Sequence, residues 1–325
     1  MELLTELEIP ITLFLQSIGS WLEYPMQVFT FLGNELFFLL FMPAIYWSID
    51  PKIGFRAGMM LIISGGVNSF FKFLFHSPRP FWVDERVTAY SSETSFGVPS
   101  GHSQNSAAIW GIVAASMKKK WATILVAILV FLIGVSRIYL GMHFLRDVLS
   151  GWLIGVLIVL VYMKLEKPLS RWLQNKKLGY QLLMCLLLSL LLIGLGVLGQ
   201  TTSRAFTLPP EWIQTAVSSG AEVPDPYNIE GVITIAGVAL GFTAGYAWYR
   251  SRFGVYTIKC STGKRLVRYL IGLAGIVILY FGLKLVLPEE PIALGILLRY
   301  LRYALIGFWV TALAPLIFRA LDLDR

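Results

Sequence analysis

The sequence has little charge. Only 14% of its 325 residues are Asp, Glu, Lys or Arg, against 56% hydrophobic residues, whereas soluble globular proteins carry about 25% charged residues. An ordinary soluble domain is therefore excluded. The apolar runs are continuous over roughly 20 residues, enough for a helix to cross a bilayer, and they lack the short alternating pattern of a membrane β-barrel. We predict an all-α integral membrane protein, a polytopic helical bundle.

Cysteine is also scarce. Cys185 lies in an apolar run and Cys260 in a basic loop, so the two offer no disulfide framework. Neither a zinc-type Cys/His spacing nor a glycine-rich phosphate loop is present. The first residues lack a basic segment, so we expect no cleavable signal peptide.

The hydropathy pattern predicts about nine membrane crossings. We divide the chain into an interfacial N-terminal helix (1–33), a helical core (34–170) and a four-helix transmembrane extension (171–325). The predicted crossings are 34–49, 54–75, 102–118, 121–141, 145–165, 180–199, 231–249, 267–287 and 297–318.

The loops predict an orientation. Most of the 27 basic residues fall on one set of alternate loops, including Lys118–Lys120 and Lys176–Lys177. Loops rich in Lys and Arg stay in the cytoplasm. We therefore expect the N-terminus outside and the C-terminus in the cytoplasm of a cell, in a membrane that is most simply the cytoplasmic (inner) one. The basic residues are spread over several loops and form no single patch, so no nucleic-acid partner is expected.

Three polar clusters interrupt the apolar sequence, and all three fall on the predicted extracytoplasmic side. Together they supply three cations, two of the chain's three histidines and a carboxylate, which is a set of groups suited to phosphoryl transfer. The clusters are Lys72 with Arg79-Pro80, Pro99-Ser100-Gly101-His102, and Ser136-Arg137 with His143 and Asp147.

The third cluster is the most specific. His143 and Asp147 are four residues apart, so they share one face of a helix that begins there. A carboxylate on one ring nitrogen fixes the tautomer and leaves the other nitrogen as a nucleophile. Simpler interpretations remain for single residues: Ser100 as only a helix cap, Lys72 as a lysine that reaches the interface, and Asp147 as a cap paired with Arg146.

The three clusters, in order and without substitution, resemble the motifs of the type 2 phosphatidic acid phosphatase superfamily, which includes lipid phosphate phosphatases and glucose-6-phosphatases. With the flanking crossings, the resemblance covers residues 34–166. It implies a phosphatase that works without a metal or any other cofactor. The nine crossings resemble the layout of glucose-6-phosphatases and sphingoid-phosphate phosphatases.

The resemblance also implies roles for the motif residues. His143 corresponds to the nucleophile that forms a phosphohistidine, Asp147 to its orienting partner, and His102 to the general acid and base. The remaining residues correspond to the phosphate-binding groups, namely Lys72, Arg79, Ser100, Gly101, Ser136 and Arg137. His76 lies between two of them and has no assigned role.

We therefore expect a phosphoric-ester hydrolase acting on a lipid phosphate or lipid diphosphate among the membrane lipids, with its site on the extracytoplasmic side. One alternative is a phosphotransferase or sugar-phosphate phosphatase on the same site. Another, of a different class, is a protein that only binds or transports a phospholipid.

Overall fold

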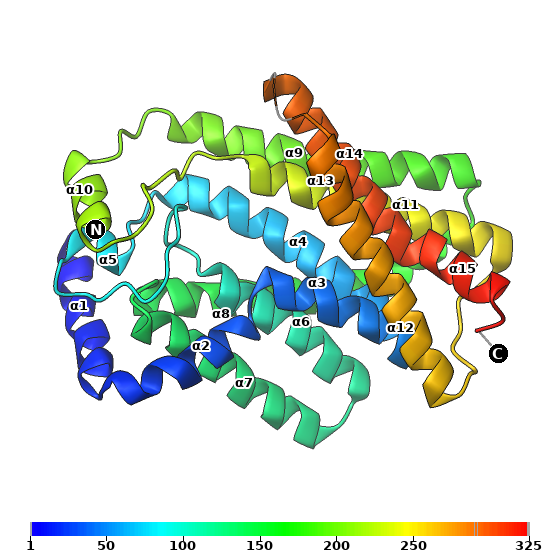
Figure 1. Cartoon of the computed structure of the whole chain (residues 1–325), viewed down its shortest axis with the longest axis horizontal. Coiled ribbons are helices and arrows are strands. Elements are labelled where there is room, and N and C mark those ends of the chain that lie inside the picture. Colours follow the sequence, from blue (N-terminus) through cyan, green and yellow to red (C-terminus); the bar gives the residue numbers. More distant parts are fainter. Residues whose placement is uncertain (1, 289, 291, 324–325) are drawn as a thin grey trace. The chain divides into compact units, whose positions relative to one another are not determined.

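The computed structural model in Figure 1 describes residues 2–288, 290 and 292–323, and these form helices, turns and loops without a strand. The prediction of an all-α protein is confirmed. The helices are α1 (Glu2–Ser17), η1 (Ser20–Leu22), α2 (Glu23–Phe31), α3 (Glu35–Ala44), η2 (Ile45–Ile49), α4 (Pro51–Phe75), α5 (Pro80–Val83), α6 (Gly101–Met117), α7 (Lys120–Tyr139), α8 (Leu145–Gln174), α9 (Leu178–Ser203), α10 (Pro210–Ser218), α11 (Glu230–Phe253), α12 (Thr262–Val277), η3 (Ile278–Gly282), α13 (Leu283–Val286), α14 (Ile292–Phe308), η4 (Trp309–Leu313) and α15 (Ala314–Ala320).

In the described part of the chain, seven helical stretches are long and apolar enough to cross a membrane, and an eighth is possible if a bent helix pair forms one span. The bent pair joins Ser20–Phe31 to Glu35–Ile49 at an angle of 50°. The predicted crossing at 102–118 corresponds to α6, which has only 17 residues. At 1.5 Å per residue, such a helix is a few ångströms shorter than a hydrocarbon core of about 30 Å. Membrane spans are thus confirmed, while the count of nine and the orientation stay predictions.

The described chain forms two compact units, each assembled from separate stretches of sequence. The first contains the residues up to Phe38, Val67–Leu160 and Gly196–Ile229. The second contains Leu39–Gly66, Val161–Leu195 and the residues from Glu230 onward. All nine predicted site residues belong to the first unit. The three-part division at residues 33 and 170 stays a prediction.

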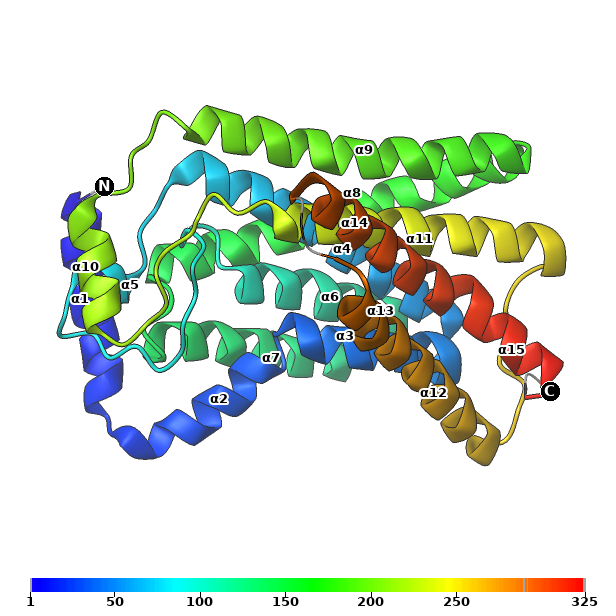
Figure 2. The ribbon, with the colours of Figure 1, turned by 45° about the horizontal axis from the view of Figure 1, so that its top comes forward.

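In the first unit, α6 and α7 pack against each other as a helical hairpin, and α2 packs along α7 (Figure 2). The hairpin turns at Lys118, whose backbone has a positive φ of 54°. A second contact joins α10 to the short α5. The buried rings of Phe81, Trp82 and Phe96 lie in the core of this region. The loops that carry the polar clusters therefore pack against a hydrophobic core.

The second unit has its own core around Trp47, which is fully buried and donates from Nε1 to the carbonyl oxygen of Val310 at 2.8 Å. Helices α11 and α14 pack at very short range. A Cβ placed on Gly241 would lie 1.7 Å from the carbonyl oxygen of Ala304. Small residues permit such close approach of helices in membranes.

Candidate active site

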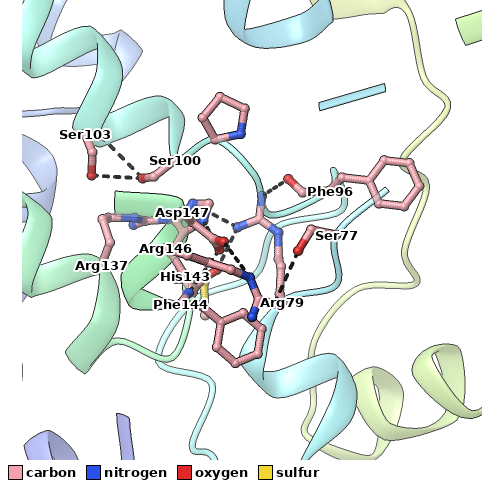
Figure 3. Close-up of polar contacts among 12 residues, drawn as sticks. Ser77, Arg79, Phe96, Ser100, Ser103, Arg137, His143, Phe144, Arg146 and Asp147 are labelled. Carbon is pink, nitrogen blue, oxygen red and sulfur yellow. Dashed lines mark hydrogen bonds and ion pairs between the residues drawn. The ribbon is translucent and has the colours of Figure 1, made fainter. Parts of the chain in front are cut away.

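The three clusters meet within the first unit. Lys72 lies in the last turn of α4, Arg79 immediately precedes α5, and Arg137 lies in the last turn of α7. His143 stands in the connection between α7 and α8, and Asp147 lies in the first turn of α8. Figure 3 shows Arg79, His143 and Asp147 grouped together. Residues far apart in sequence therefore form one polar site, as the motifs predict.

Arg79 is the most connected residue of this site and is fully buried. Its Nε donates to the carbonyl oxygen of Ser95 at 2.6 Å, and Nη1 donates to that of Met142 at 3.0 Å. Nη1 also lies 3.2 Å from Nε2 of His143. Nη2 donates to Oε2 of Glu93 at 3.1 Å and to Oγ of Ser95 at 3.0 Å. These contacts fix the plane of the guanidinium group, so the arginine is oriented before any ligand binds.

His143 lies between Arg79 and Asp147. Its Nδ1 is 3.2 Å from Oδ2 of Asp147, and both side chains are buried. An arginine N–H can only donate, so Nε2 of His143 accepts from Arg79 and the ring proton is assigned to Nδ1, which donates to Asp147. Oδ2 of Asp147 also accepts the backbone N–H of Phe144 at 3.0 Å. Asp147 therefore caps the start of α8 and also contacts the imidazole of His143. Its use as a helix cap and its predicted use as the partner of His143 are compatible with each other.

The second cluster is attached to the third through the backbone. The N–H of Ser100 donates to the carbonyl oxygen of Asp147 at 2.9 Å. The hydroxyl of Ser100 accepts the N–H of Ser103 at 3.4 Å, so Ser100 is the N-cap of α6. Asn68 donates from Nδ2 to the carbonyl oxygen of Pro99 at 3.1 Å. These bonds place the N-terminus of α6, where a helix favours anions, beside the start of α8.

Glu93 joins the cations of the site. Its Oε1 lies 2.6 Å from Nη2 of Arg137 and 3.9 Å from Nδ1 of His102, while Oε2 meets Arg79. Glu93 belongs to the loop before α6, outside the membrane-spanning helices. Burial acts to raise its pKa, but the charges of Arg79 and Arg137 outweigh burial and hold the pKa well below its ordinary value. Glu93 is therefore an anion in the centre of a cationic site.

One of the three side-chain nitrogen atoms of Arg137 makes no hydrogen bond within the described residues. Its Nη1 donates to Oγ1 of Thr30 at 2.7 Å and its Nη2 to Glu93, whereas its Nε is buried and makes no hydrogen bond within the described residues. The neighbouring Ser136 is turned away, since its hydroxyl donates to the carbonyl oxygen of Ile133 at 2.6 Å. Arg137 is thus linked to Arg79 through Glu93, while the hydroxyl of Ser136 is engaged within its own helix.

Lys72 and Gly101 complete the predicted set. The Nζ of Lys72 donates to Oγ of Ser95 at 2.8 Å, the same hydroxyl that accepts from Arg79. Gly101 is the first residue of α6. Lys72 is therefore connected to Arg79 through one serine. The roles assigned to these two residues, and to the other seven residues of the predicted set, stay predictions.

His76 lies outside this network. Its ring stacks on Phe206 with centroids 4.8 Å apart and meets Phe96 edge-on at 5.4 Å. Its Nε2 is buried and makes no hydrogen bond to the described residues. His76 thus packs among aromatic rings beside the site.

Three contributors were missed because no motif marks them: Asn68, Glu93 and Ser95. Glu93 and Ser95 lie in the polar run Ser91–Ser95, within a loop that was already placed on the same side as the clusters. A carboxylate in such a loop, near three predicted cations, was the available signal. Asn68 had none, since a single amide in an apolar helix has many uses.

The loop between α10 and α11 is hydrogen-bonded to this polar run. The backbone N–H of Asp225 donates to the carbonyl oxygen of Thr94 at 3.1 Å, and that of Glu222 donates to Oγ of Ser92 at 2.8 Å. Both partners flank Glu93. The position of Glu93 therefore depends on residues more than a hundred positions away, which no local pattern predicts.

Metal ligands are a separate question. Within the described ranges, no group of three or more His, Cys, Asp and Glu side chains is placed to hold a metal ion.

Models of known protein families match two regions of this chain, and the first region contains all three polar clusters. The model of the PAP2 superfamily matches residues 54–171, and the model of the transmembrane extension of PAP2 superfamily phosphatases matches 233–325. Phosphatidylglycerophosphatase B of Bacillus subtilis (strain 168) is 35% identical over 170 residues, 48% of this chain and 80% of the relative. Sphingosine-1-phosphate phosphatase 1 of Mus musculus is 26% identical over 305 residues, 89% of this chain and 70% of the relative.

Human glucose-6-phosphatase 3 is 31% identical over 169 residues, 44% of this chain and 49% of the relative. The chain belongs to the PAP2 superfamily, and the resemblance drawn from the motifs is confirmed. It is an integral membrane protein and a phosphoric-ester hydrolase of the kind that acts on lipid or sugar phosphates.

Proposed function

We propose that this protein hydrolyses a phosphorylated lipid through a phosphohistidine at His143. The observation that carries the proposal is the position of the His143 ring, with Nδ1 against Asp147 and Nε2 beside Arg79. A ring held in this tautomer carries its lone pair on Nε2, which attacks an electrophile once the N–H of Arg79 turns from Nε2 to the substrate. The same arrangement places a guanidinium group next to the atom under attack, where it stabilises charge that develops on the phosphoryl oxygens.

The first step transfers the phosphoryl group. Nε2 of His143 attacks phosphorus, the bond from phosphorus to the lipid oxygen breaks, and His102 gives a proton to the departing alkoxide. Asp147 stabilises the positive charge that the His143 ring acquires. General acid catalysis of this kind contributes about 10²–10⁴-fold in rate.

The second step releases phosphate. A water oxygen attacks phosphorus, His102 takes up the proton of that water, and the bond from phosphorus to Nε2 breaks. Arg79, Arg137 and Lys72 hold the phosphoryl oxygens during both steps, with the hydroxyl of Ser100 and the backbone N–H of Gly101 as further expected donors. The hydroxyl of Ser136 can join them only by leaving the carbonyl oxygen of Ile133. Three cations supply the charge that a metal ion supplies in other phosphoryl-transfer enzymes, so the proposed reaction uses no metal or other cofactor.

A lipid substrate is supported by two of the named relatives, a sphingosine-1-phosphate phosphatase and a phosphatidylglycerophosphatase. A sugar phosphate is the second candidate, because glucose-6-phosphatase 3 is also similar. The test is phosphate release from sphingosine 1-phosphate, phosphatidic acid, phosphatidylglycerol phosphate and glucose 6-phosphate, with wild type beside His143→Ala. Turnover of at least one lipid that is lost in His143→Ala supports the proposal. Turnover of glucose 6-phosphate alone favours the second candidate.

Two further outcomes of this assay bear on the remaining alternatives. Release of phosphate without an added acceptor excludes an obligate phosphotransferase. A protein that only binds or transports lipids would release no phosphate and would keep lipid binding in His143→Ala.

The proposed site faces the extracytoplasmic side of a cytoplasmic membrane, as the distribution of basic loops indicates. Single cysteines at Lys119 and at Glu222 test this, in a background in which Cys185 and Cys260 are replaced by Ala. Intact cells or right-side-out vesicles should label position 222 but not 119 with a membrane-impermeant maleimide. The reverse pattern would place the site in the cytoplasm.

A further inference from the structure

Glu93 has no role in the reaction proposed above, yet it occupies the centre of the cationic site. It contacts both arginines that are expected to bind phosphate, at 3.1 Å for Arg79 and 2.6 Å for Arg137. Arginine binds carboxylate and phosphate with the same planar fork of N–H donors. A carboxylate that bridges two such forks therefore stands where a phosphoryl group would make the same bonds.

The donors of Arg79 support this interpretation. One N–H, on Nε, donates to the carbonyl oxygen of Ser95, and Nη1 is taken up by Met142 and His143. Only Nη2, which bonds Glu93, Ser95 and more weakly Phe96, remains to meet a ligand. A phosphate cannot gain a strong bond to this arginine while the Glu93 carboxylate stays in place.

Arg137 supplies the second observation. The side chain is 2% exposed, and its buried Nε makes no hydrogen bond within the described residues. A buried donor without an acceptor is destabilising, because it has lost its hydrogen bond to water. A carboxylate has two oxygens, and in Glu93 one goes to each arginine. A phosphoryl group has three terminal oxygens, so it can replace both bonds and still reach this remaining N–H.

We propose that the Glu93 carboxylate holds the place of the substrate's phosphoryl group before substrate binds, and that phosphate binding displaces it from Arg79 and Arg137. The inference rests on the proposed function, because it assumes that these two arginines bind phosphate. The side chain of Glu93 is 25% exposed, so it has a route away from the arginines. The backbone around it stays fixed, since Ser92 and Thr94 are held by the loop between α10 and α11.

The displaced carboxylate acts as a competitor within the protein. A site that is open for only a fraction of the time binds every ligand more weakly by that fraction. The penalty falls equally on all anions. It therefore keeps singly charged phosphodiesters, which surround the protein in a membrane, below saturation, whereas phosphate monoesters with a charge of about −1.5 to −2 bind strongly enough to overcome it.

The test compares wild type with Glu93→Gln in detergent micelles. The amide keeps the shape of the side chain but loses its charge. We expect the inhibition constant of inorganic phosphate to fall about tenfold, because hydrogen bonds to charged groups are worth roughly twice those between neutral groups. The same is expected for diethyl phosphate, a soluble diester. The control is Glu85→Gln, which removes a charge from an exposed position of the same loop and should change neither constant.

Thermal stability provides a readout that does not require turnover. Without Glu93, three cations lie together without their shared anion, so Glu93→Gln should unfold at a lower temperature than wild type. Inorganic phosphate should then raise the unfolding temperature of Glu93→Gln more than that of wild type. Glu93→Asp keeps the charge and should remain closer to wild type in both measurements.

Two results would overturn the inference. One is an inhibition constant of phosphate that is unchanged in Glu93→Gln. The other is a higher inhibition constant, which would mean that Glu93 positions the arginines for phosphate. If Glu93→Gln does not fold, Glu93→Ala and Glu93→Asp carry the same comparison. A wild-type protein that hydrolyses no monoester, yet gains stability from phosphate more strongly after Glu93→Gln, would contradict the proposed function and leave this inference standing.

Discussion

Nη1 of Arg79 lies 3.2 Å from Nε2 of His143, and Oδ2 of Asp147 lies 3.2 Å from Nδ1 of the same ring. The imidazole is thus held between a cation and an anion, with one nitrogen assigned to each. This arrangement makes the ring an acceptor on the side of the arginine. It is the feature from which the phosphohistidine proposal and the first two predictions follow.

The Asp147→Asn substitution should reduce kcat by about 10²–10⁴-fold, because the amide no longer selects the Nδ1–H tautomer or stabilises the charged ring.

His143→Ala should abolish turnover. A rapid acid quench with ³²P-labelled substrate should trap an acid-labile phosphoprotein in wild type and none in His143→Ala. If the His143→Ala protein also becomes labelled, the nucleophile must be another residue.

The Arg79→Lys substitution should lower kcat/KM by at least about a hundredfold, because an ammonium group cannot replace a planar fork with five donors. The buried carbonyl oxygens of Ser95 and Met142 would lose their donor, so the unfolding temperature should also fall. Arg86→Lys is the matched control, since that side chain is 72% exposed and pairs only with Asp84. If the two substitutions change kcat/KM equally, the guanidinium group of Arg79 is not needed for the reaction.

The Gly97→Ala substitution tests how tightly the loop before α6 is packed on Asp147. An added Cβ would lie 2.7 Å from the carbonyl oxygen of Pro78 and 2.9 Å from Oδ2 of Asp147. Both distances are too short, so the loop or the carboxylate must move, and kcat should fall at least about tenfold with the imidazole displaced. Gly194→Ala, where nothing lies within 4 Å of the added Cβ, should keep full activity.

How much of this site was predictable depends on whether a residue acts through a motif or through the folded chain. The i, i+4 spacing of His143 and Asp147 predicted their contact, although the expected shared helix face was wrong, since α8 begins at Leu145 and His143 lies before it. The cap at Ser100 follows from residue type alone. Glu93 could not be placed in the same way. Its position depends on bonds from Glu222 and Asp225 to its neighbours.

The membrane spans illustrate the same limit. Hydropathy identified the apolar helices, but α6 has only 17 residues, and its first turns bury Ser103, Gln104 and Asn105. A helix that is covered by its neighbours needs neither the length nor the apolar surface of a helix exposed to lipid. Hydropathy alone does not separate these two cases, so the number of crossings was the least predictable part of the fold.

The pH dependence of stability should reveal the charge on Glu93. Its folded pKa lies well below the ordinary value of 4.5, because the nearby arginines outweigh burial. The stabilising contribution of its ion pairs is therefore fully present above about pH 5 and is lost as the pH falls toward the folded pKa, because the unfolded chain binds the proton first. The unfolding temperature of wild type should exceed that of Glu93→Gln by a constant amount between pH 5 and pH 8, about the range in which Glu93 is ionised in both states. Below that range the difference should shrink. A difference that instead grows on acidification would mean that Glu93 is protonated in the folded protein, and that the arginines lack the resident anion on which the displacement proposal depends.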